Sequence, residues 1–560
     1  MGVRFAATQR TTMLQEMAEK PLDVLVIGGG ITGAGIAWDA VLRGLRVGLV
    51  EKQDFAAGTS SRSTKLIHGG LRYLKQGEIG LVREVGRERA IVYRNAPHVV
   101  HPEPMLLPVV KGGSLGRFSA SFGVWLYDRL AGVKRAERRR VLSREEALAA
   151  EPLLPAERLK GAILYTEYRT DDARLTLEVL KAAAARGALA VNYAEAVDFL
   201  YEGGRVAGAV VCDRLSGETY AIRAKHVVNA AGPWVDRLRE KDGSLTGKRL
   251  HLTKGVHLVV PHERFPVRQA VYFDVFDGRM VFAIPRDGKT YIGTTDTDYH
   301  GSLEHPEVTP EDRDYLLRAV NDMFPTVHLR PEDVESCWAG LRPLLHEEGK
   351  APSELSRRDE IFVSPTGLIT IAGGKLTGFR KMAERVVDLV CRRLGEEEGR
   401  RVGPCITDRV PLSGGDVGGP EGLSDAVRNG TREGVSRGLS PEEAEQLARR
   451  YGSNTPAVLA GIQRAREASA RHNLPLGLAL EVLYGVEAEM AVTPADVLIR
   501  RTGMLLFDRP RCEKVAEGVV RWMGELFGWS PQEADRYHQE LEAELAHARR
   551  AGRTNRVSNG

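Results

Sequence analysis

Apolar and polar positions near the start of the chain follow the pattern of a β-strand, an α-helix and a second β-strand. Residues 24–27 are a short aliphatic run, which is typical of a buried parallel strand. Apolar residues then recur at helical spacing over residues 36–41, and residues 47–50 form a second short apolar run. The pattern therefore predicts one βαβ unit over residues 23–51.

Later segments extend this sheet and predict a second one. Residues 227–232 and 368–374 each form an apolar run that ends in glycine, and a helix is predicted over residues 381–394. Residues 256–260 and 280–284 alternate between apolar and polar, as half-buried antiparallel strands do. We predict an α/β fold, with a discontinuous Rossmann-like dinucleotide-binding domain and an antiparallel β substrate domain.

The last quarter of the chain carries repeated helix-start signals. Ser440-Pro441, Thr493-Pro494 and Ser530-Pro531 each place a capping residue before a proline, which suits the first position of a helix. An all-helical C-terminal domain is therefore expected. The predicted organisation is an N-terminal extension (1–20), a dinucleotide-binding domain (21–98, 151–253 and 330–395), a substrate-binding or cap domain (99–150 and 254–329), a linker (396–422), the helical domain (423–549) and a tail (550–560).

Composition excludes several classes of protein. Hydrophobic residues make up 42% of the 560 residues, which is enough for a large core and argues against wholesale disorder. The 79 Lys and Arg residues exceed the 75 Asp and Glu residues by only four, so no nucleic-acid partner is expected. The five cysteines form no CxxC pair, which argues against a disulfide scaffold or a cysteine zinc site, and no metal is expected. Without an apolar run of about 20 residues or a signal peptide, a cytoplasmic location is expected.

The βαβ unit contains the glycine pattern of a dinucleotide site. Gly28 permits the tight turn after the first strand, Gly30 lets a pyrophosphate approach the backbone, and Gly33 allows close helix–strand packing. The start of the helix offers unpaired N–H groups to the phosphates. Glu51, at the end of the second strand, is placed to accept hydrogen bonds from ribose hydroxyls. An acid at this position argues against NADP but does not distinguish FAD from NAD.

The next stretch, residues 58–74, is dense in hydroxyl groups, glycines and cations. Small hydroxyl side chains can bind a second set of phosphate oxygens, and Gly69-Gly70 can bring the backbone close to a flat ring system. The residues of this stretch that we predict to contact the cofactor are Thr59, Ser60, Ser61, Lys65, Leu66 and His68.

These motifs resemble the FAD-dependent glycerol-3-phosphate dehydrogenases, a family of respiratory flavoenzymes that also includes α-glycerophosphate oxidase. The resemblance rests on GTSSRSTKLIHGGLRYL (58–74) and on the segment 23–61, followed in order by DDARL (171–175), NAAGPW (229–234), KGVH (254–257), IGTTD (292–296), GLRPL (340–344) and GGKLT (373–377). It is close over residues 23–393 and looser beyond. It implies an FAD-binding domain of the glutathione-reductase or D-amino-acid-oxidase type, FAD as cofactor, and glycerol 3-phosphate as substrate. The sequence carries no evident covalent-attachment motif, so we assume that FAD is bound noncovalently.

The resemblance also selects candidate site residues among the cations. A phosphate anchor requires arginines and lysines, and the family motifs favour Arg72 with Tyr73, Arg342 and Lys375. Arg357 and Arg358 are adjacent, and we assign Arg358 to the substrate site although the sequence does not decide between them. Further cofactor contacts are expected at Gly232, Gly374, Lys375, Leu376 and Thr377.

His257 is the candidate base. A histidine with a pKa near neutrality suits proton abstraction, and a nearby Lys254 or Arg342 would lower its pKa. The alternative is a structural histidine at the start of a strand, which the residues alone favour and the resemblance disfavours. The predicted catalytic residues are therefore His257, Arg342 and Lys375, whereas Asp171, Asp172 and Arg174 are expected to form a structural ion-pair network.

The electron acceptor is left open by the sequence. The resemblance implies a membrane quinone, with oxygen as the alternative in an oxidase. Aromatic residues in 116–130 and cations in 134–140 suit an interfacial helix on an anionic membrane surface, but an ordinary buried helix fits equally well. A homodimer is expected. The rival functions are an FAD-dependent amino-acid or hydroxy-acid oxidase, which would lack the Arg-Tyr pair of residues 65–74, and a non-enzymatic scaffold that binds a partner.

Overall fold

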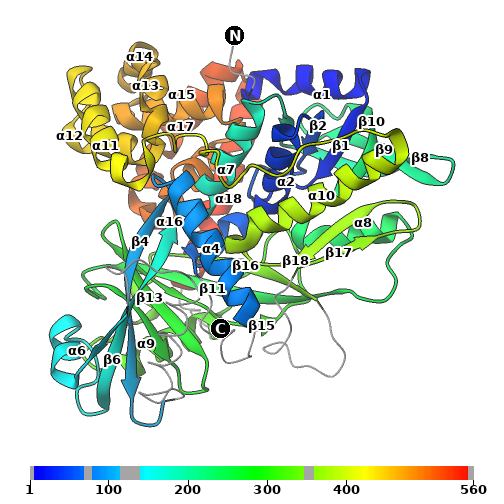
Figure 1. Cartoon of the computed structure of the whole chain (residues 1–560). Helices are drawn as coiled ribbons and strands as arrows, with labels where there is room; N and C mark the ends of the chain where they lie inside the picture. Colours follow the sequence, from blue (N-terminus) through cyan, green and yellow to red (C-terminus); the bar gives the residue numbers. More distant parts are fainter. Residues whose placement is uncertain (1–4, 69–78, 114–138, 346–358, 553–560) are drawn as a thin grey trace, which may run out of the picture.

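The computed structural model describes residues 5–68, 79–113, 139–345 and 359–552. Within these ranges the chain forms two large sheets and a group of C-terminal helices, coloured yellow to red in Figure 1. This arrangement confirms the predicted α/β fold class with a helical C-terminal region.

The smaller sheet has eight strands and contains the predicted βαβ unit. Its centre is parallel, because β1 pairs with β2 and β10, β2 pairs with β7, and β10 pairs with β18. The antiparallel strand β17 lies at one edge, and the β8–β9 hairpin extends β10. The strands are β1 (Leu22–Ile27), β2 (Val47–Val50), β7 (Leu189–Val191), β8 (Ala194–Glu202), β9 (Arg205–Asp213), β10 (Thr219–Asn229), β17 (Asp359–Val363) and β18 (Ile369–Gly373).

Helices cover this sheet and build its core. Helix α2 packs against α7 and α10, and α1 contacts β7 and β10. The helices are α1 (Arg10–Glu19), α2 (Ile31–Leu42), α4 (Ile79–Asn95), α7 (Asp172–Ala184), α8 (Val235–Lys241) and α10 (Phe379–Glu398). Met13, Leu14 and Met17 of α1 are buried, and Arg10 forms an ion pair of 2.9 Å with Asp213. The predicted N-terminal extension therefore contains a docked helix.

The larger sheet has ten strands and is antiparallel apart from the parallel pair of β4 and β12. Its strands are β3 (Leu66–Ile67), β4 (Val100–Val110), β5 (Arg140–Leu142), β6 (Leu159–Thr170), β11 (Leu250–Pro261), β12 (Ala270–Asp274), β13 (Met280–Arg286), β14 (Lys289–Gly293), β15 (Thr297–Asp298) and β16 (Ser336–Leu345). Strands β3, β6 and β16 fall in segments that the sequence assigned to the dinucleotide-binding domain. They belong to this sheet by hydrogen bonding, because β6 pairs with β4 and β3, and β16 pairs with β11.

Different helices pack on different parts of the larger sheet. A core cluster joins its side chains to α6 (Arg144–Ala150) and α9 (Pro310–Met323), and another joins them to the C-terminal helices. The C-terminal helices are α11 (Gly419–Ser436), α12 (Pro441–Tyr451), α13 (Thr455–Leu459), α14 (Ile462–His472), α15 (Leu476–Ala488), α16 (Met504–Phe507), α17 (Arg509–Phe527) and α18 (Pro531–Arg549). As predicted, Ser440 and Ser530 cap α12 and α18, each with proline at the first position.

Short 3₁₀ and π turns link these elements. The 3₁₀ turns are η1 (Ala7–Gln9), η2 (Thr59–Ser61), η4 (Gly232–Trp234), η5 (Pro331–Asp333), η7 (Leu376–Gly378), η8 (Gly452–Asn454) and η10 (Arg550–Gly552). The turn η9 (Asp496–Arg501) is π-helical. π-helical turns are rare in proteins, and those that occur are often found at functional sites.

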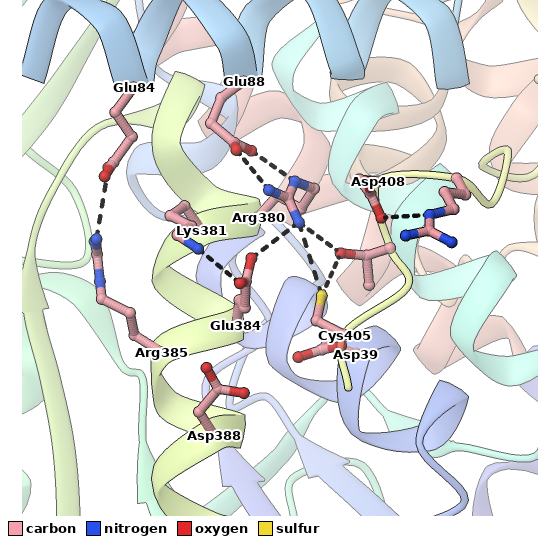
Figure 2. A network of polar contacts seen from close by, with 12 residues as sticks. Asp39, Glu84, Glu88, Arg380, Lys381, Glu384, Arg385, Asp388, Cys405 and Asp408 are labelled. Carbon is pink, nitrogen blue, oxygen red and sulfur yellow. Dashed lines mark hydrogen bonds and ion pairs between the residues drawn. The ribbon is translucent and has the colours of Figure 1, made fainter. Parts of the chain in front are cut away.

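A buried polar network fixes the start of α10 (Figure 2). Arg380 contacts both carboxylate oxygens of Glu88 on α4, at 2.5 and 2.6 Å, and donates to Thr407 at 3.0 Å. Cys405 lies against the same guanidinium. The network therefore ties the start of α10, which follows β18 and η7 in the chain, to α4.

In the part of the chain that the structure describes, no helix combines the length and apolar character needed to cross a bilayer.

Candidate active site

A cavity of about 1000 Å³ lies where the two sheets meet. On one side it is lined by the carboxyl ends of β1, β2, β10 and β18, where open α/β sheets bind their ligands. On the other side it is lined by residues of β11, β12, β13 and β16 of the larger sheet. We call the side lined by β1, β2, β10 and β18 the glycine wall, and the side lined by β11, β12, β13 and β16 the side-chain wall.

Three glycines shape the glycine wall in different ways. Gly28 has a φ of +117°, and a Cβ there would lie 2.5 Å from the carbonyl oxygen of Ala230. A Cβ on Gly33 would lie 1.9 Å from the Gly28 oxygen, so this residue serves the packing of α2 on β1. A Cβ on Gly30 would lie 3.1 Å from Ser60 Oγ, and Gly30 itself lines the cavity.

Glu51 is held rigidly at the end of β2. One of its carboxylate oxygens accepts the N–H of Gly29 at 2.7 Å, and the other accepts the N–H of Gln53 at 2.9 Å. Burial raises the pKa of the Glu51 carboxyl, and these two hydrogen bonds oppose the rise. The carboxylate therefore lines the cavity in one orientation, with acceptor capacity left for a ribose.

Glu304 connects three side chains near this end of the cavity. Its Oε1 lies 2.8 Å from the Lys52 ammonium, 2.9 Å from Trp234 Nε1 and 3.0 Å from the Arg237 guanidinium. Burial acts to raise the pKa of Glu304, but the bonds from Lys52 and Trp234 outweigh it and lower the pKa to about 2. The carboxylate stays ionised at neutral pH and holds Lys52 and Trp234 against the cavity.

His257, in the middle of β11, is almost fully buried on the side-chain wall. Its ring stacks on Trp338 with a centroid distance of 4.7 Å and an angle of 10°. Its Nε2 lies 2.9 Å from Thr64 Oγ1, and its buried Nδ1 has no hydrogen-bond partner among the described residues. Burial, and then the charges of Arg342 and Lys65, hold the pKa of His257 well below its usual value. The imidazole is neutral at pH 7 and able to accept a proton.

Arg342 presents a fixed guanidinium to the same cavity from β16. It forms an ion pair of 3.0 Å with Asp296 and donates to Thr294 Oγ1 at 2.9 Å. A Cβ on Gly255 of the neighbouring strand would lie 2.4 Å from Arg342 Nη2, so only glycine leaves room for this side chain. Arg279 also lines the cavity and donates to the carbonyl oxygen of Asp296.

Most of the predicted site residues meet in this cavity. Those that line it are Gly28, Gly30, Glu51, Thr59, Ser60, Leu66, His68, Gly232, His257, Arg342, Gly374, Lys375, Leu376 and Thr377. Gly33 lies behind the wall, as its packing role requires. Arg72, Tyr73, Arg357, Arg358 and the segment 114–138 lie outside the described residues, so their predicted roles stay predictions.

Lys65 and Ser61 do not line the cavity, unlike the sequence expectation. Lys65 is buried, forms an ion pair of 2.6 Å with Asp172 and donates to the carbonyl oxygen of Ser61. A buried ammonium needs such a partner, and Asp172 supplies it. The structural interpretation of the 171–174 segment is confirmed, because Arg174 in turn pairs with Glu178 and Glu489.

Sequence reasoning missed several residues of the side-chain wall. Tyr272 and Phe282 stack on each other at 4.1 Å and line the cavity, and Thr64 and Trp338 contact His257. The alternating strands signalled a sheet but not which face borders the cavity. Arg279 follows an Asp-Gly turn between two such strands, and that turn is the one local signal that points to it. No cluster of three potential metal ligands occurs among the described residues.

A parallel sheet with a glycine-rich turn at its carboxyl end, bordering a large cavity, is typical of a dinucleotide-binding protein. The family profile described as FAD dependent oxidoreductase matches residues 23–380, and the profile for the C-terminal domain of alpha-glycerophosphate oxidase matches residues 405–534. The chain belongs to the FAD-dependent oxidoreductase family, among the glycerol-3-phosphate dehydrogenases.

Relatives match almost the whole chain. The aerobic glycerol-3-phosphate dehydrogenase of Bacillus subtilis is 54% identical over 541 residues, which cover 97% of this chain and 98% of that protein. The enzyme of the same name from Staphylococcus aureus (strain USA300) is 50% identical, covering 96% and 97%. The crystal structure of the glycerol-3-phosphate dehydrogenase from Bacillus halodurans, complexed with FAD, has a TM-score of 0.85 at 50% identity and covers 97% and 98%.

FAD is the cofactor of this family, and the cavity fits it. Gly28, Gly30 and the start of α2 line the cavity, where a pyrophosphate can approach the backbone, and the fixed carboxylate of Glu51 suits a ribose. The cavity then continues past His68 and Gly374 to the side-chain wall, so one elongated ligand can reach from Glu51 towards His257.

Proposed function

We propose that this chain oxidises sn-glycerol 3-phosphate to dihydroxyacetone phosphate and passes the electrons to a membrane quinone. The observation that carries this proposal is the side-chain wall, where a neutral, buried His257 and the guanidinium of Arg342 border the cavity that begins at the glycine turn. The names of the near relatives support the choice of substrate.

His257 acts as the base in this proposal. When bound, FAD supplies a flavin ring that accepts a hydride from the carbinol carbon. The neutral imidazole takes the hydroxyl proton, and its stacking on Trp338 and its bond to Thr64 hold the ring in one orientation. The positive charges of Arg342 and Lys375, which line the same cavity, would stabilise the alkoxide that develops.

Arg342 and Lys375 anchor the phosphate end of the substrate. Arg342 supplies positive charge beside the cavity for the phosphate, and its bonds to Asp296 and Thr294 fix the guanidinium before substrate arrives. Lys375 lines the cavity at the start of η7, after the glycine turn of β18. Arg72, Tyr73 and Arg358 complete the proposed anchor by resemblance.

Cofactor binding in this proposal falls mainly to the glycine wall. Gly28, Gly30 and the start of α2 border the pyrophosphate, Glu51 the ribose, and Thr59, Ser60, Leu66, His68, Gly232, Gly374, Leu376 and Thr377 the remaining length of FAD. Their shared position along one cavity supports the assignment.

The experiment that tests the substrate is a panel assay of the purified holoenzyme with an artificial electron acceptor. We expect turnover with sn-glycerol 3-phosphate, much weaker turnover with its enantiomer, and none with glycerol, because glycerol lacks the anion. Equal turnover with amino acids or simple hydroxy acids would contradict the proposal and favour the amino-acid or hydroxy-acid oxidase alternative.

The acceptor and the membrane need separate tests. We propose a cytoplasmic homodimer that binds the inner face of the membrane through residues 116–140. A ubiquinone or menaquinone analogue should then be reduced stoichiometrically with little hydrogen peroxide, whereas a full yield of peroxide would identify an oxidase.

Deleting residues 134–140 should abolish cosedimentation with anionic liposomes at low salt. Light scattering of the intact protein would reveal the oligomeric state.

A further inference from the structure

Asp54 lies three residues after Glu51 and is held by the C-terminal domain. Its carboxylate is 1% exposed and accepts bonds from Arg500 Nε at 2.5 Å and from Arg501 Nη2 at 2.9 Å. Asn192 donates to the same carboxylate at 2.9 Å. Two arginines of a domain more than 440 residues away in sequence therefore converge on one acid in the loop that follows Glu51.

The loop that carries Asp54 is bonded at both ends to the glycine turn. At its start, Glu51 accepts the Gly29 N–H at 2.7 Å. At its end, the N–H of Ala56 donates to the carbonyl oxygen of Gly29 at 3.0 Å. Asp54 lies between these two contacts, so a displacement of Asp54 displaces Glu51, the glycine turn or both.

The arginines are themselves anchored within the helical domain. Arg501 is fully buried and donates to the carbonyl oxygen of Glu489 at 2.7 Å. Arg500 donates to Asp496 at 2.7 Å, and Asp496 also accepts from Tyr193 at 2.7 Å. Both arginines end the π-helical turn η9, whose wider winding is frequent at functional sites.

Charge reinforces this arrangement. Burial acts to raise the pKa of the Asp54 carboxyl, but the positive charges of Arg501 and Arg500 outweigh it and lower the pKa to about 2. The acid is therefore ionised at neutral pH, and an ionised buried acid cannot leave its arginines without a large desolvation cost.

We propose that Arg500 and Arg501 are positioning residues for the cofactor: through Asp54 they hold the loop from Glu51 to Ala56 in the conformation that binds the adenosine half of FAD. The C-terminal domain is then a clamp on the cofactor. This inference rests on the proposed placement of the FAD ribose at Glu51, but not on the identity of the substrate.

A second buried ion pair across the same domain boundary provides a matched control. Lys181 of α7 pairs with Glu489 at 2.9 Å, and both side chains are buried. Lys181 lines no part of the cavity and makes no contact with the loop from Glu51 to Ala56 among the interactions of the described residues. A loss of domain docking alone would affect both pairs alike.

The experiment measures the release of FAD from the holoenzyme after dilution, followed by the rise of free-flavin fluorescence. Thermal unfolding of the same samples reports general stability. We expect Arg501→Gln to release FAD about tenfold faster than the wild type, Arg500→Gln less, and Lys181→Gln within about twofold of the wild type at a similar loss of melting temperature. Arg501→Lys should partly restore retention. If Arg501→Gln does not fold, the rate of FAD release from Arg500→Gln tests the proposal, because Arg500 is the more exposed of the two arginines.

Two results would overturn the proposal: unchanged FAD release in the arginine variants, or equally fast release in Lys181→Gln. FAD release is measured without substrate, so its outcome does not depend on whether the proposed substrate is correct. In enzyme kept saturated with FAD, the KM for sn-glycerol 3-phosphate should stay at the wild-type value in both arginine variants.

Discussion

The two walls of the cavity are built by opposite means. The glycine wall offers its backbone to the cavity: Gly28 and Gly33 are required because a Cβ would strike backbone atoms, and Gly30 borders the cavity directly. The side-chain wall offers buried imidazole, aromatic rings and guanidinium groups, with Gly255 and Gly293 giving space to Arg342 and His257. Shape therefore specifies the cofactor end, and charge and protonation specify the reacting end. Substitutions on the two walls should separate cofactor retention from turnover.

The largest effect is expected from His257→Gln. This change keeps a polar side chain but removes the proposed base, and general bases contribute about 10²- to 10⁴-fold to a rate. We expect kcat to fall by that factor with FAD content unchanged, as measured by flavin absorbance and steady-state kinetics. Loss of FAD in proportion to the loss of rate would erase the distinction between the walls.

Arg342→Ala should rank second. In the proposed anchor the substrate phosphate would lose a cationic partner, and we expect kcat/KM for sn-glycerol 3-phosphate to fall by about 2 kcal/mol, or roughly 30-fold, mainly through KM. Arg342→Lys, which keeps the charge without the fork, should recover part of the loss. A wild-type KM in the alanine variant would remove Arg342 from the phosphate anchor.

Gly33→Ala tests the opposite wall. A Cβ there would meet the Gly28 oxygen at 1.9 Å, so the glycine turn must shift. We expect a stability loss of about 1–3 kcal/mol and weaker FAD binding, while the fraction of enzyme that keeps FAD turns over at the normal rate. The control is Gly80→Ala on α4, where no atom lies within 4 Å of the new Cβ and a small stabilisation is expected.

A smaller effect concerns pH. His257 has its pKa held well below 6.5 by burial and then by Arg342, so the folded protein binds fewer protons here than the unfolded chain. The stability that this neutral histidine contributes is present above pH 6.5, the pKa of an unfolded histidine, and is lost as pH falls below it. The acid limb of the pH profile of kcat/KM should lie well below pH 6.5. Arg342→Ala removes a positive charge, so the limb should move to higher pH. An unmoved limb would assign it to another group.

The smallest effect is expected from Thr64→Val, which keeps the shape but removes the hydroxyl beside His257 Nε2. We expect kcat to fall by about 3- to 10-fold, equivalent to about 0.5–1.5 kcal/mol for one hydrogen bond, with Thr64→Ser close to the wild type. An equal loss in both variants would point to packing rather than the hydrogen bond.

How much could be predicted from the sequence also differs between the walls. The pattern of the glycine wall is local: Gly28, Gly33 and Glu51 fall within one βαβ unit, and spacing alone placed them. The two sheets and the helix caps at Ser440 and Ser530 followed from equally local periodicity. The family resemblance, rather than spacing, selected His257 and Arg342.

What the sequence could not show depends on contacts between distant segments. Lys65 looked like a cofactor contact but pairs with Asp172, and the convergence of Arg500 and Arg501 on Asp54 spans most of the chain. Strands β3, β6 and β16 joined the larger sheet because their hydrogen-bond partners, not their own patterns, decide which sheet they enter. Local sequence suggested that Asp171, Asp172 and Arg174 form ion pairs, but their partners lie in distant segments and only the folded molecule shows them.

The most direct test is anaerobic reduction of the bound flavin, followed by its visible spectrum after rapid mixing with sn-glycerol 3-phosphate. The account predicts that wild-type flavin bleaches with this substrate and not with glycerol. His257→Gln and Arg342→Ala, loaded with the same FAD, should bleach about 100-fold or more and about 30-fold more slowly, respectively, at subsaturating substrate. Flavin that stays oxidised in the wild type, or bleaches at equal rates in all three proteins, would contradict the assignment of the reaction to the side-chain wall.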